Sequence, residues 1–145
     1  MWYFDSSAIL GAMLEQKNSD AIKSLLSEDI CTSRLSRVEV FRAISKVAPE
    51  LRQTCEDFFA RCAVIEMERT FLKRAEGYSE EITLKSADAI HVATVEFLQP
   101  MLLGLVTLDK QMATNARRLG IKVHELIQQQ RLRLAIAHQH LQRML

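Results

Sequence analysis

Short apolar runs alternate with longer segments of helical periodicity along this chain. The runs are bounded by charged or turn-forming residues and comprise residues 2–4, 30–32, 63–65, 103–108 and 121–123. Between them, apolar side chains recur at the intervals expected for helices that bury one face. Short strands that alternate with helices are typical of a parallel sheet covered by helices on both faces. The pattern therefore predicts an α/β fold.

The chain contains few residues that would mark a linker between domains. It has 4 Gly and 2 Pro in 145 residues, and its length suits one domain. We expect this domain to span residues 1–126. Residues 127–145 follow as a helical extension, because Ile127, Leu134, Leu141 and Leu145 recur at spacings of seven and four. Their apolar stripe requires a covering surface, which is either the same domain or another chain.

Charge and cysteine content narrow the classes of function. The 19 basic and 18 acidic residues give a net charge of +1, so the protein lacks the large positive field that binds nucleic acid by charge alone. The apolar run at residues 101–108 is far shorter than the ~20 residues that span a bilayer. Cys31, Cys55 and Cys62 show no C-x-x-C spacing. We therefore expect no membrane segment and a reducing, cytoplasmic environment.

Two aspartates directly follow predicted strands. Asp5 ends the first apolar run and precedes the helix-like segment SSAILGAML. Asp109 stands in the same way between LGLVTLD and KQMATNARRLG, a helix that Gly120 can end. Taken separately, each aspartate can be explained as a helix N-cap, because a carboxylate accepts hydrogen bonds from the free N–H groups of the first turn.

Two further acids lie on predicted helices. Asp88 is in the first turn of SADAIHVATVEFL, which is apolar on nearly every side, and Ser86 is its predicted cap. A buried carboxylate without a partner is costly, which favours a metal ion or a base at this position. Glu39 shares a polar stripe with Arg42 and Lys46, which by itself predicts an ordinary exposed face with ion pairs.

The predicted topology brings these four acids to one edge of the sheet. Parallel strands end at a common edge, and the helices that follow them begin there. Asp5, Glu39 and Asp109 follow strands, and Asp88 opens a helix that runs back towards the strand at 103–108. A cluster of like charges requires compensation, and oxygen ligands suit Mg²⁺ or Mn²⁺. Such a site is suited to the hydrolysis of phosphodiesters.

Four segments carry a family resemblance. In this order and spacing they resemble the motifs of the PIN-domain family, and the chain has a size similar to that of its VapC-type toxins: YFDSSAIL, TSRLSRVEVFRA, SADAIHVATV and VTLDKQMATNARRLGIKV. The resemblance covers residues 1–126. It implies a metal-dependent endoribonuclease that is selective for single strands and requires Mg²⁺ or Mn²⁺. It also implies RNA as the substrate and a cognate antitoxin as the inhibitor; we expect a homodimer.

The resemblance assigns roles to particular residues. The acidic positions of the family fall on Asp5, Glu39, Asp88 and Asp109, as metal ligands and catalytic residues. Its hydroxyl positions fall on Ser6 and Thr107. Basic residues near the acids are candidates for contacts with RNA phosphates, or belong to exposed ion-paired faces. They are Arg34, Arg37, Arg42, Lys46 and Lys110, with Arg117 and Arg118 further along.

Some alternatives remain open at this point. His91 lies one turn from Asp88 and is either a hydrogen-bonded histidine of the core or a donor to the site. The chain lacks G-x-S-x-G, G-x-G-x-x-G and G-x-x-x-x-G-K, so serine hydrolysis, dinucleotide binding and a P-loop are not supported. The alternative to a nuclease is a PIN-like module that binds RNA or protein without catalysis.

Overall fold

The computed structural model describes residues 1–16, 19–126, 139 and 142. The described residues form one parallel sheet with the order β3-β2-β1-β4. Its strands are β1 (Trp2–Phe4), β2 (Ile30–Ser33), β3 (Ala63–Ile65) and β4 (Gly104–Val106). The α/β class is confirmed. The predicted extension at 127–145 lies outside the described residues except for positions 139 and 142.

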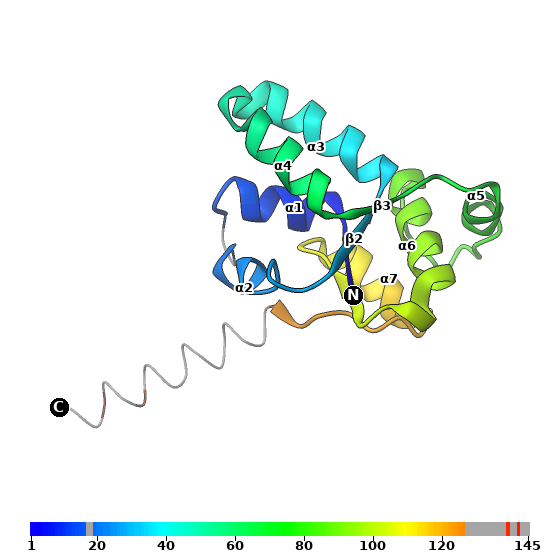
Figure 1. The fold of residues 1–145 in the computed structure, drawn as a ribbon. Coiled ribbons are helices and arrows are strands. Elements are labelled where there is room, and N and C mark those ends of the chain that lie inside the picture. Colours follow the sequence, from blue (N-terminus) through cyan, green and yellow to red (C-terminus); the bar gives the residue numbers. More distant parts are fainter. Residues whose placement is uncertain (17–18, 127–138, 140–141, 143–145) are drawn as a thin grey trace.

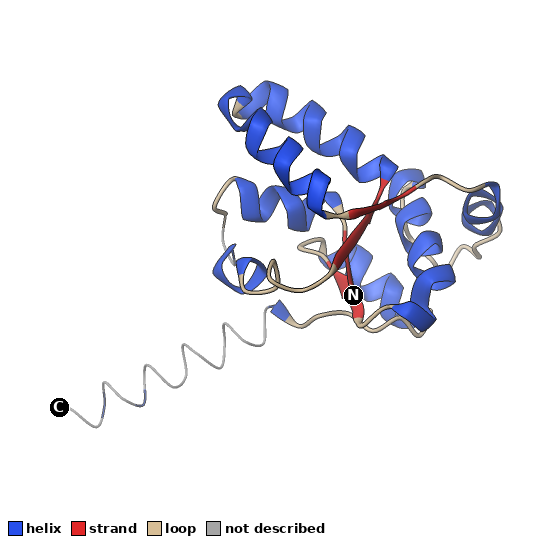
Figure 2. Ribbon diagram, viewed as in Figure 1, coloured by secondary structure: helices blue, strands red, loops and turns tan. Residues whose placement is uncertain are grey.

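Helices connect these strands and cover both faces of the sheet (Figures 1 and 2). The α-helices of the described residues are α1 (Ser6–Met13), α2 (Ser19–Lys23), α3 (Arg34–Val47), α4 (Arg52–Arg61), α5 (Arg69–Glu76), α6 (Ser86–Leu98) and α7 (Lys110–Arg118). Two short 3-10 helices among these residues are η1 (Pro49–Leu51) and η2 (Gln99–Met101). Helix α5 lies outermost and packs on α6.

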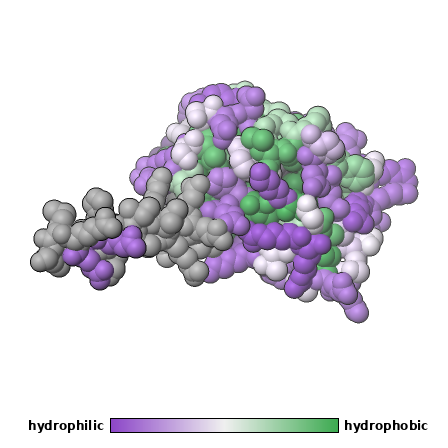
Figure 3. All heavy atoms as spheres, turned by 90° about the horizontal axis from the view of Figure 1, so that it is seen from below, coloured by the Kyte–Doolittle hydropathy of each residue, from purple (hydrophilic) through white to green (hydrophobic). Residues whose placement is uncertain are grey.

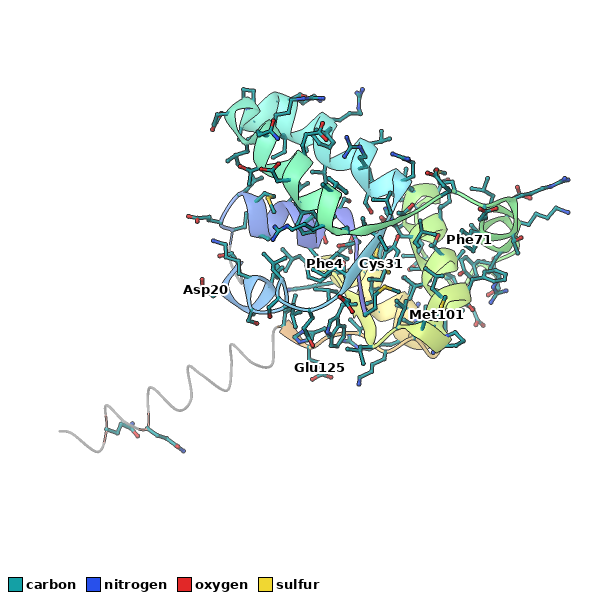
Figure 4. The ribbon with its side chains drawn as sticks, in the orientation of Figure 1. Phe4, Asp20, Cys31, Phe71, Met101 and Glu125 are labelled. Atoms are coloured by element: carbon teal, nitrogen blue, oxygen red, sulfur yellow. The ribbon has the colours of Figure 1, made fainter. Side chains whose placement is uncertain are left out.

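The sheet separates two hydrophobic clusters because successive side chains of a strand point to opposite faces. Phe4 packs with residues of α1, α3 and α4 on one face. Tyr3 and Cys31 pack with residues of α6 and α7 on the other. Phe4 and Cys31 lie near the middle of the molecule, whereas Phe71 lies between α5 and α6 (Figure 4). Both faces of the sheet are thus buried, as in parallel sheets generally.

The last two predicted strands are shorter than expected. The run at 103–108 forms a strand only over Gly104–Val106. Beyond this strand, backbone N–H groups donate to side-chain hydroxyls instead of to a neighbouring strand. The N–H of Leu108 donates to Ser7 Oγ at 2.9 Å. The run at 121–123 makes a single parallel bridge from Val123 to Leu105. It passes so close to Gly104 that a Cβ there would lie 2.7 Å from the Lys122 carbonyl oxygen.

The surface carries hydrophobic side chains among polar ones. Figure 3 shows this mixture on one face. Phe97, Met101 and Leu103 are among the large side chains that remain exposed. Among the described residues, no helix combines the length and apolar character that a membrane crossing requires. All three cysteines are free.

Candidate active site at the carboxyl edge of the sheet

Asp5 ends β1 and caps α1. Its side chain is 2% exposed. Oδ1 accepts the N–H of Ala8 at 2.9 Å and the hydroxyl of Ser7 at 2.7 Å, and Oδ2 accepts the hydroxyl of Thr107 at 2.6 Å. Burial raises the pKa of Asp5, while the hydrogen bonds from Thr107, Ala8 and Ser7 act in the opposite direction. Asp5 is therefore the predicted N-cap, and both of its carboxylate oxygens accept hydrogen bonds.

A pair of hydroxyls joins the ends of β1 and β4. Thr107, a predicted supporting residue, donates to Asp5 and accepts the N–H of Asp109 at 3.1 Å. The other hydroxyl on Asp5 belongs to Ser7, whereas Ser6 was expected from the resemblance. The turn into α1 explains the difference, because the hydroxyl two residues after the cap reaches back to its carboxylate. Ser7 also accepts the N–H of Leu108, which ties the two strand ends together.

Asp109 caps α7 as the local pattern predicts. Its Oδ1 accepts the N–H groups of Gln111 at 2.8 Å and Met112 at 3.0 Å. The helix ends in a Schellman motif, in which Gly120 has φ +78° and the N–H of Ile121 donates to the Ala116 carbonyl oxygen at 2.9 Å. These bonds fix the start of α7 beside the end of β4.

Asp88 lies in the first turn of α6 and is partly buried. Burial raises its pKa, and the negative charge of Asp109, followed by that of Glu39, adds to the rise. These effects identify Asp109 and Glu39 as its electrostatic neighbours. The prediction of a Ser86 cap is wrong, because the helix already begins at Ser86 and its cap position, Lys85, makes no side-chain cap bond.

Glu39 does not make the ion pairs that its neighbouring residues on α3 predict. Its carboxylate does not form the expected ion pairs along the stripe of α3; instead, Oε1 lies 2.6 Å from Nε2 of His91. His91 is 1% exposed, and its Nδ1 lies 2.8 Å from the hydroxyl of Tyr3. His91 is therefore a hydrogen-bonded histidine of the core that also contacts a candidate site residue. The helical pattern of either segment alone could not reveal this contact between α3 and α6.

The candidate RNA-binding residues differ in the contacts that they make. Arg34 and Arg37 form ion pairs with Glu66 at 2.8 Å and Glu56 at 2.7 Å, as their exposed-face interpretation predicts. Arg118 donates to the backbone carbonyl of Glu81. The remaining candidates form no ion pair within the described part of the chain, and these are Arg42, Lys46, Lys110 and Arg117.

The four acids share one region without forming a closed metal cage. Among residues 1–16, 19–126, 139 and 142, no three acidic, histidine or cysteine side chains form a group that could hold a metal ion. No lysine or arginine of these residues forms an ion pair with any of the four acids. Mg²⁺ is usually held by one or two carboxylates and several waters, so a cage of three protein ligands is not required. The uncompensated oxygen donors therefore fit this class of ion.

Comparison with known proteins identifies the family. The family model described as PIN domain matches residues 2–118. The chain therefore belongs to the PIN-domain family. Its similarity within that family is to the VapC type, as the resemblance predicted. The chain is 32% identical to Ribonuclease VapC46 of Mycobacterium tuberculosis over 123 residues, which cover 83% of this chain and 94% of that protein.

Two further comparisons agree with this assignment. Ribonuclease VapC35 of Mycobacterium tuberculosis is 31% identical over 129 residues, which cover 85% of this chain and 95% of the relative. A chain in the structure of a toxin-antitoxin complex from Klebsiella pneumoniae has the same fold, with a TM-score of 0.64 and 20% identity. The similarity covers 78% of this chain and 91% of that chain. This structural similarity supports the PIN-like fold.

Proposed function

We propose that the protein is a metal-dependent endoribonuclease and the toxin of a toxin–antitoxin pair. The observation that carries this proposal is the proximity of Asp88 to Asp109 and Glu39, with Asp5 linked to the start of α7 through Thr107, and no lysine or arginine of the described residues paired to any of the four acids. The ribonuclease relatives and the toxin–antitoxin neighbour support the substrate class and the antitoxin partner. We further propose that the toxin acts as a homodimer in the cytoplasm.

We propose that Mg²⁺ or Mn²⁺ binds among the four acids, with some of the carboxylates as direct ligands and the others holding its bound waters. When bound, the ion would activate water for attack and stabilise the negative charge of the phosphate. The chain itself would fix the orientation of the carboxylates. Asp5 is held by Thr107 and Ser7, and Asp109 by the first N–H groups of α7. Arg42, Lys46 and Lys110 are the proposed contacts to RNA phosphates, since their charges are not paired within the described residues.

Single Asp→Asn substitutions test the site while preserving the helix caps, because asparagine is also a good N-cap. We expect Asp5→Asn, Asp88→Asn and Asp109→Asn each to slow the cleavage of single-stranded RNA. Substituting a hydrogen-bond partner of a metal ligand already lowers metal affinity or activity by roughly 10–100-fold, so we expect the loss of a ligand itself to lower the cleavage rate by more than about 100-fold. The measurement is the initial rate on a labelled RNA with Mn²⁺ or Mg²⁺, after circular dichroism has confirmed folding.

Asp20→Asn is the matched control, because Asp20 is an exposed acid of α2 (Figure 4). It should cleave RNA at the wild-type rate. Chelation should stop the wild-type reaction, and added Mn²⁺ should restore it. Wild-type rates in two of the three site variants, or full activity in excess chelator, would refute the proposed site.

A non-catalytic PIN-like protein that binds RNA or protein is the alternative function. It predicts metal binding without turnover by the purified, antitoxin-free chain. Cleavage that disappears in the Asp→Asn variants excludes it, since a contaminating nuclease would be unaffected by these substitutions.

A further inference from the structure

His91 connects three elements beneath the carboxylate cluster. It projects from α6, and its ring nitrogens lie within hydrogen-bond distance of Tyr3 in β1 and Glu39 in α3. His91 is 1% exposed and Tyr3 is fully buried, whereas the Glu39 side chain is 32% exposed. The contact therefore links a buried pair to the partly exposed side chain of Glu39.

The chemistry of the three groups sets the direction of the hydrogen bonds. An ionised carboxylate only accepts, so the proton between Glu39 and His91 must be on Nε2. In the neutral imidazole, Nδ1 is then an acceptor for the hydroxyl of Tyr3. Burial raises the pKa of Tyr3 well above its usual value, so the phenol keeps the proton that it donates. The chain of donation runs from Tyr3 through His91 to Glu39.

We propose that His91 is a positioning residue that holds the Glu39 carboxylate in place for the divalent cation. This inference rests on the proposed function, because it requires Glu39 to be a ligand. One carboxylate oxygen, Oε1, is engaged by the imidazole, and the other is left for the ion. Without His91, Glu39 could turn towards Arg42 or Lys46 on its own helix, which is the arrangement that its local sequence favours.

The magnitude follows from the behaviour of hydrogen-bond partners behind metal ligands. Removing such a partner typically lowers metal affinity by about 10–100-fold. A histidine that only fills the core would affect stability instead, and would leave the affinity of a folded variant unchanged. Metal affinity measured without RNA therefore separates the two roles.

The test is calorimetric titration of Mn²⁺ into the full-length protein in the absence of RNA. We expect His91→Leu to bind Mn²⁺ about 10–100-fold more weakly than the wild type. His91→Gln should recover part of this loss, because its amide can still donate a hydrogen bond to Glu39. Unfolding temperatures measured in chelator report any purely structural damage separately.

Thr94→Val is the matched control on the same helix. Thr94 is also 1% exposed, and its hydroxyl donates only to the carbonyl of Ile90 in α6, at 2.8 Å. This substitution removes a buried hydrogen bond without touching Glu39. We expect it to lower stability and to leave Mn²⁺ affinity at the wild-type value. Equal losses of affinity in Thr94→Val and His91→Leu would overturn the proposal.

Tyr3→Phe gives a second, milder test, and it decides the question if His91→Leu does not fold. It removes the hydroxyl that donates a hydrogen bond to His91 Nδ1, but leaves the imidazole and the aromatic packing in place. Because the ring is then less firmly oriented, we expect weaker Mn²⁺ binding than in the wild type and stronger binding than in Glu39→Gln. If His91→Leu does not fold, wild-type Mn²⁺ affinity in a folded Tyr3→Phe variant would contradict the proposal.

The same titrations distinguish failure of this inference from failure of the proposed function. If the wild type binds no Mn²⁺, the metal-dependent function itself is wrong. If Glu39→Gln weakens binding but His91→Leu does not, only the positioning role of His91 fails. If Glu39→Gln binds like the wild type, the inference fails because Glu39 is not a ligand, while the three aspartates remain candidates.

Discussion

Asp109 accepts two backbone N–H groups of α7 through a single oxygen, Oδ1. Its Oδ2 takes part in no hydrogen bond within the described residues. Asp5 differs, because both of its oxygens accept hydrogen bonds, Oδ1 from Ala8 and Ser7 and Oδ2 from Thr107 and Ser7. The cap formed by Asp109 thus orients its carboxylate without using both oxygens. At this scale, capping leaves Asp109 one oxygen for the proposed binding of a metal ion.

Asp88 has no such cap role, so its charge is a cost in the metal-free protein. Burial and the nearby Asp109 raise its pKa above the ordinary value of 3.8. The folded chain then binds this proton more tightly than the unfolded chain does. As the pH rises from the Asp88 pKa of the unfolded chain through the higher pKa of the folded chain, the protein loses stability. At pH values above both pKa values the full penalty remains.

We expect Asp88→Asn to remove this penalty. In chelator, the variant should melt at a higher temperature than the wild type near neutral pH, by a few degrees, and the difference should shrink as the pH falls towards about 4. Scanning calorimetry over this range measures both trends. A gain in melting temperature for Asp88→Asn that grows as the pH falls would contradict this prediction.

At the scale of elements, Asn115 connects α7 to the segment that leads into α6. This side chain of α7 is 1% exposed. Its Oδ1 accepts the N–H of Thr83 at 3.0 Å, and its Nδ2 donates to Thr83 Oγ1 at 3.2 Å. Thr83 lies in the segment that leads into α6. Asn115 therefore helps to set where Asp88 lies relative to Asp109.

We expect Asn115→Ala to destabilise the protein by about 1–3 kcal/mol, because it removes the two hydrogen bonds between its buried amide and Thr83, each contributing about 0.5–1.5 kcal/mol. Urea denaturation, with the slope of the transition unchanged, measures this loss. Thr114→Ala is the control on the neighbouring position. Thr114 is exposed and donates only to the Lys110 carbonyl of its own helix. If Asn115→Ala loses no more stability than Thr114→Ala, the proposed connection between α7 and Thr83 is wrong.

Hydrophobic periodicity was enough to predict the strand–helix order, and the parallel topology was enough to place the strand ends that carry Asp5 and Asp109 at one edge. Both follow from rules that act along the chain or on whole strands. The choice between Ser6 and Ser7 depends on the turn that enters α1. The contact between Glu39 and His91 joins residues 52 positions apart. Such details depend on the packing of side chains from separate helices, so patterns within a single segment cannot supply them.

At the scale of the molecule, the chain is longer than the region that it shares with its relatives. The PIN match ends at residue 118, and VapC46 is covered over 94% of its length by 83% of this chain. Leu126 is 3% exposed and belongs to the hydrophobic cluster around Phe4. A cut directly after Leu126 therefore keeps the whole family region and the core residues described here.

The segment 127–145 is the part whose role rests on sequence alone. Its apolar residues Ile127, Leu134, Leu141 and Leu145 recur at helical spacing, and its charge is carried by arginines. No acidic residue follows Glu125, so this segment offers no carboxylate to a metal ion. An apolar stripe of this kind requires a covering surface, and we propose that a second subunit or the antitoxin provides it.

We therefore expect truncation after Leu126 to preserve metal-dependent RNA cleavage and to change the oligomeric state or the affinity for the antitoxin. Light scattering gives the mass of the truncated and full-length proteins, and a binding titration with the cognate antitoxin gives the affinity. The cleavage rate per folded chain should match that of the full-length protein. An unchanged mass together with unchanged antitoxin binding would mean that the segment only covers its own domain. Loss of cleavage in a folded truncated chain would mean that part of the active site lies beyond residue 126.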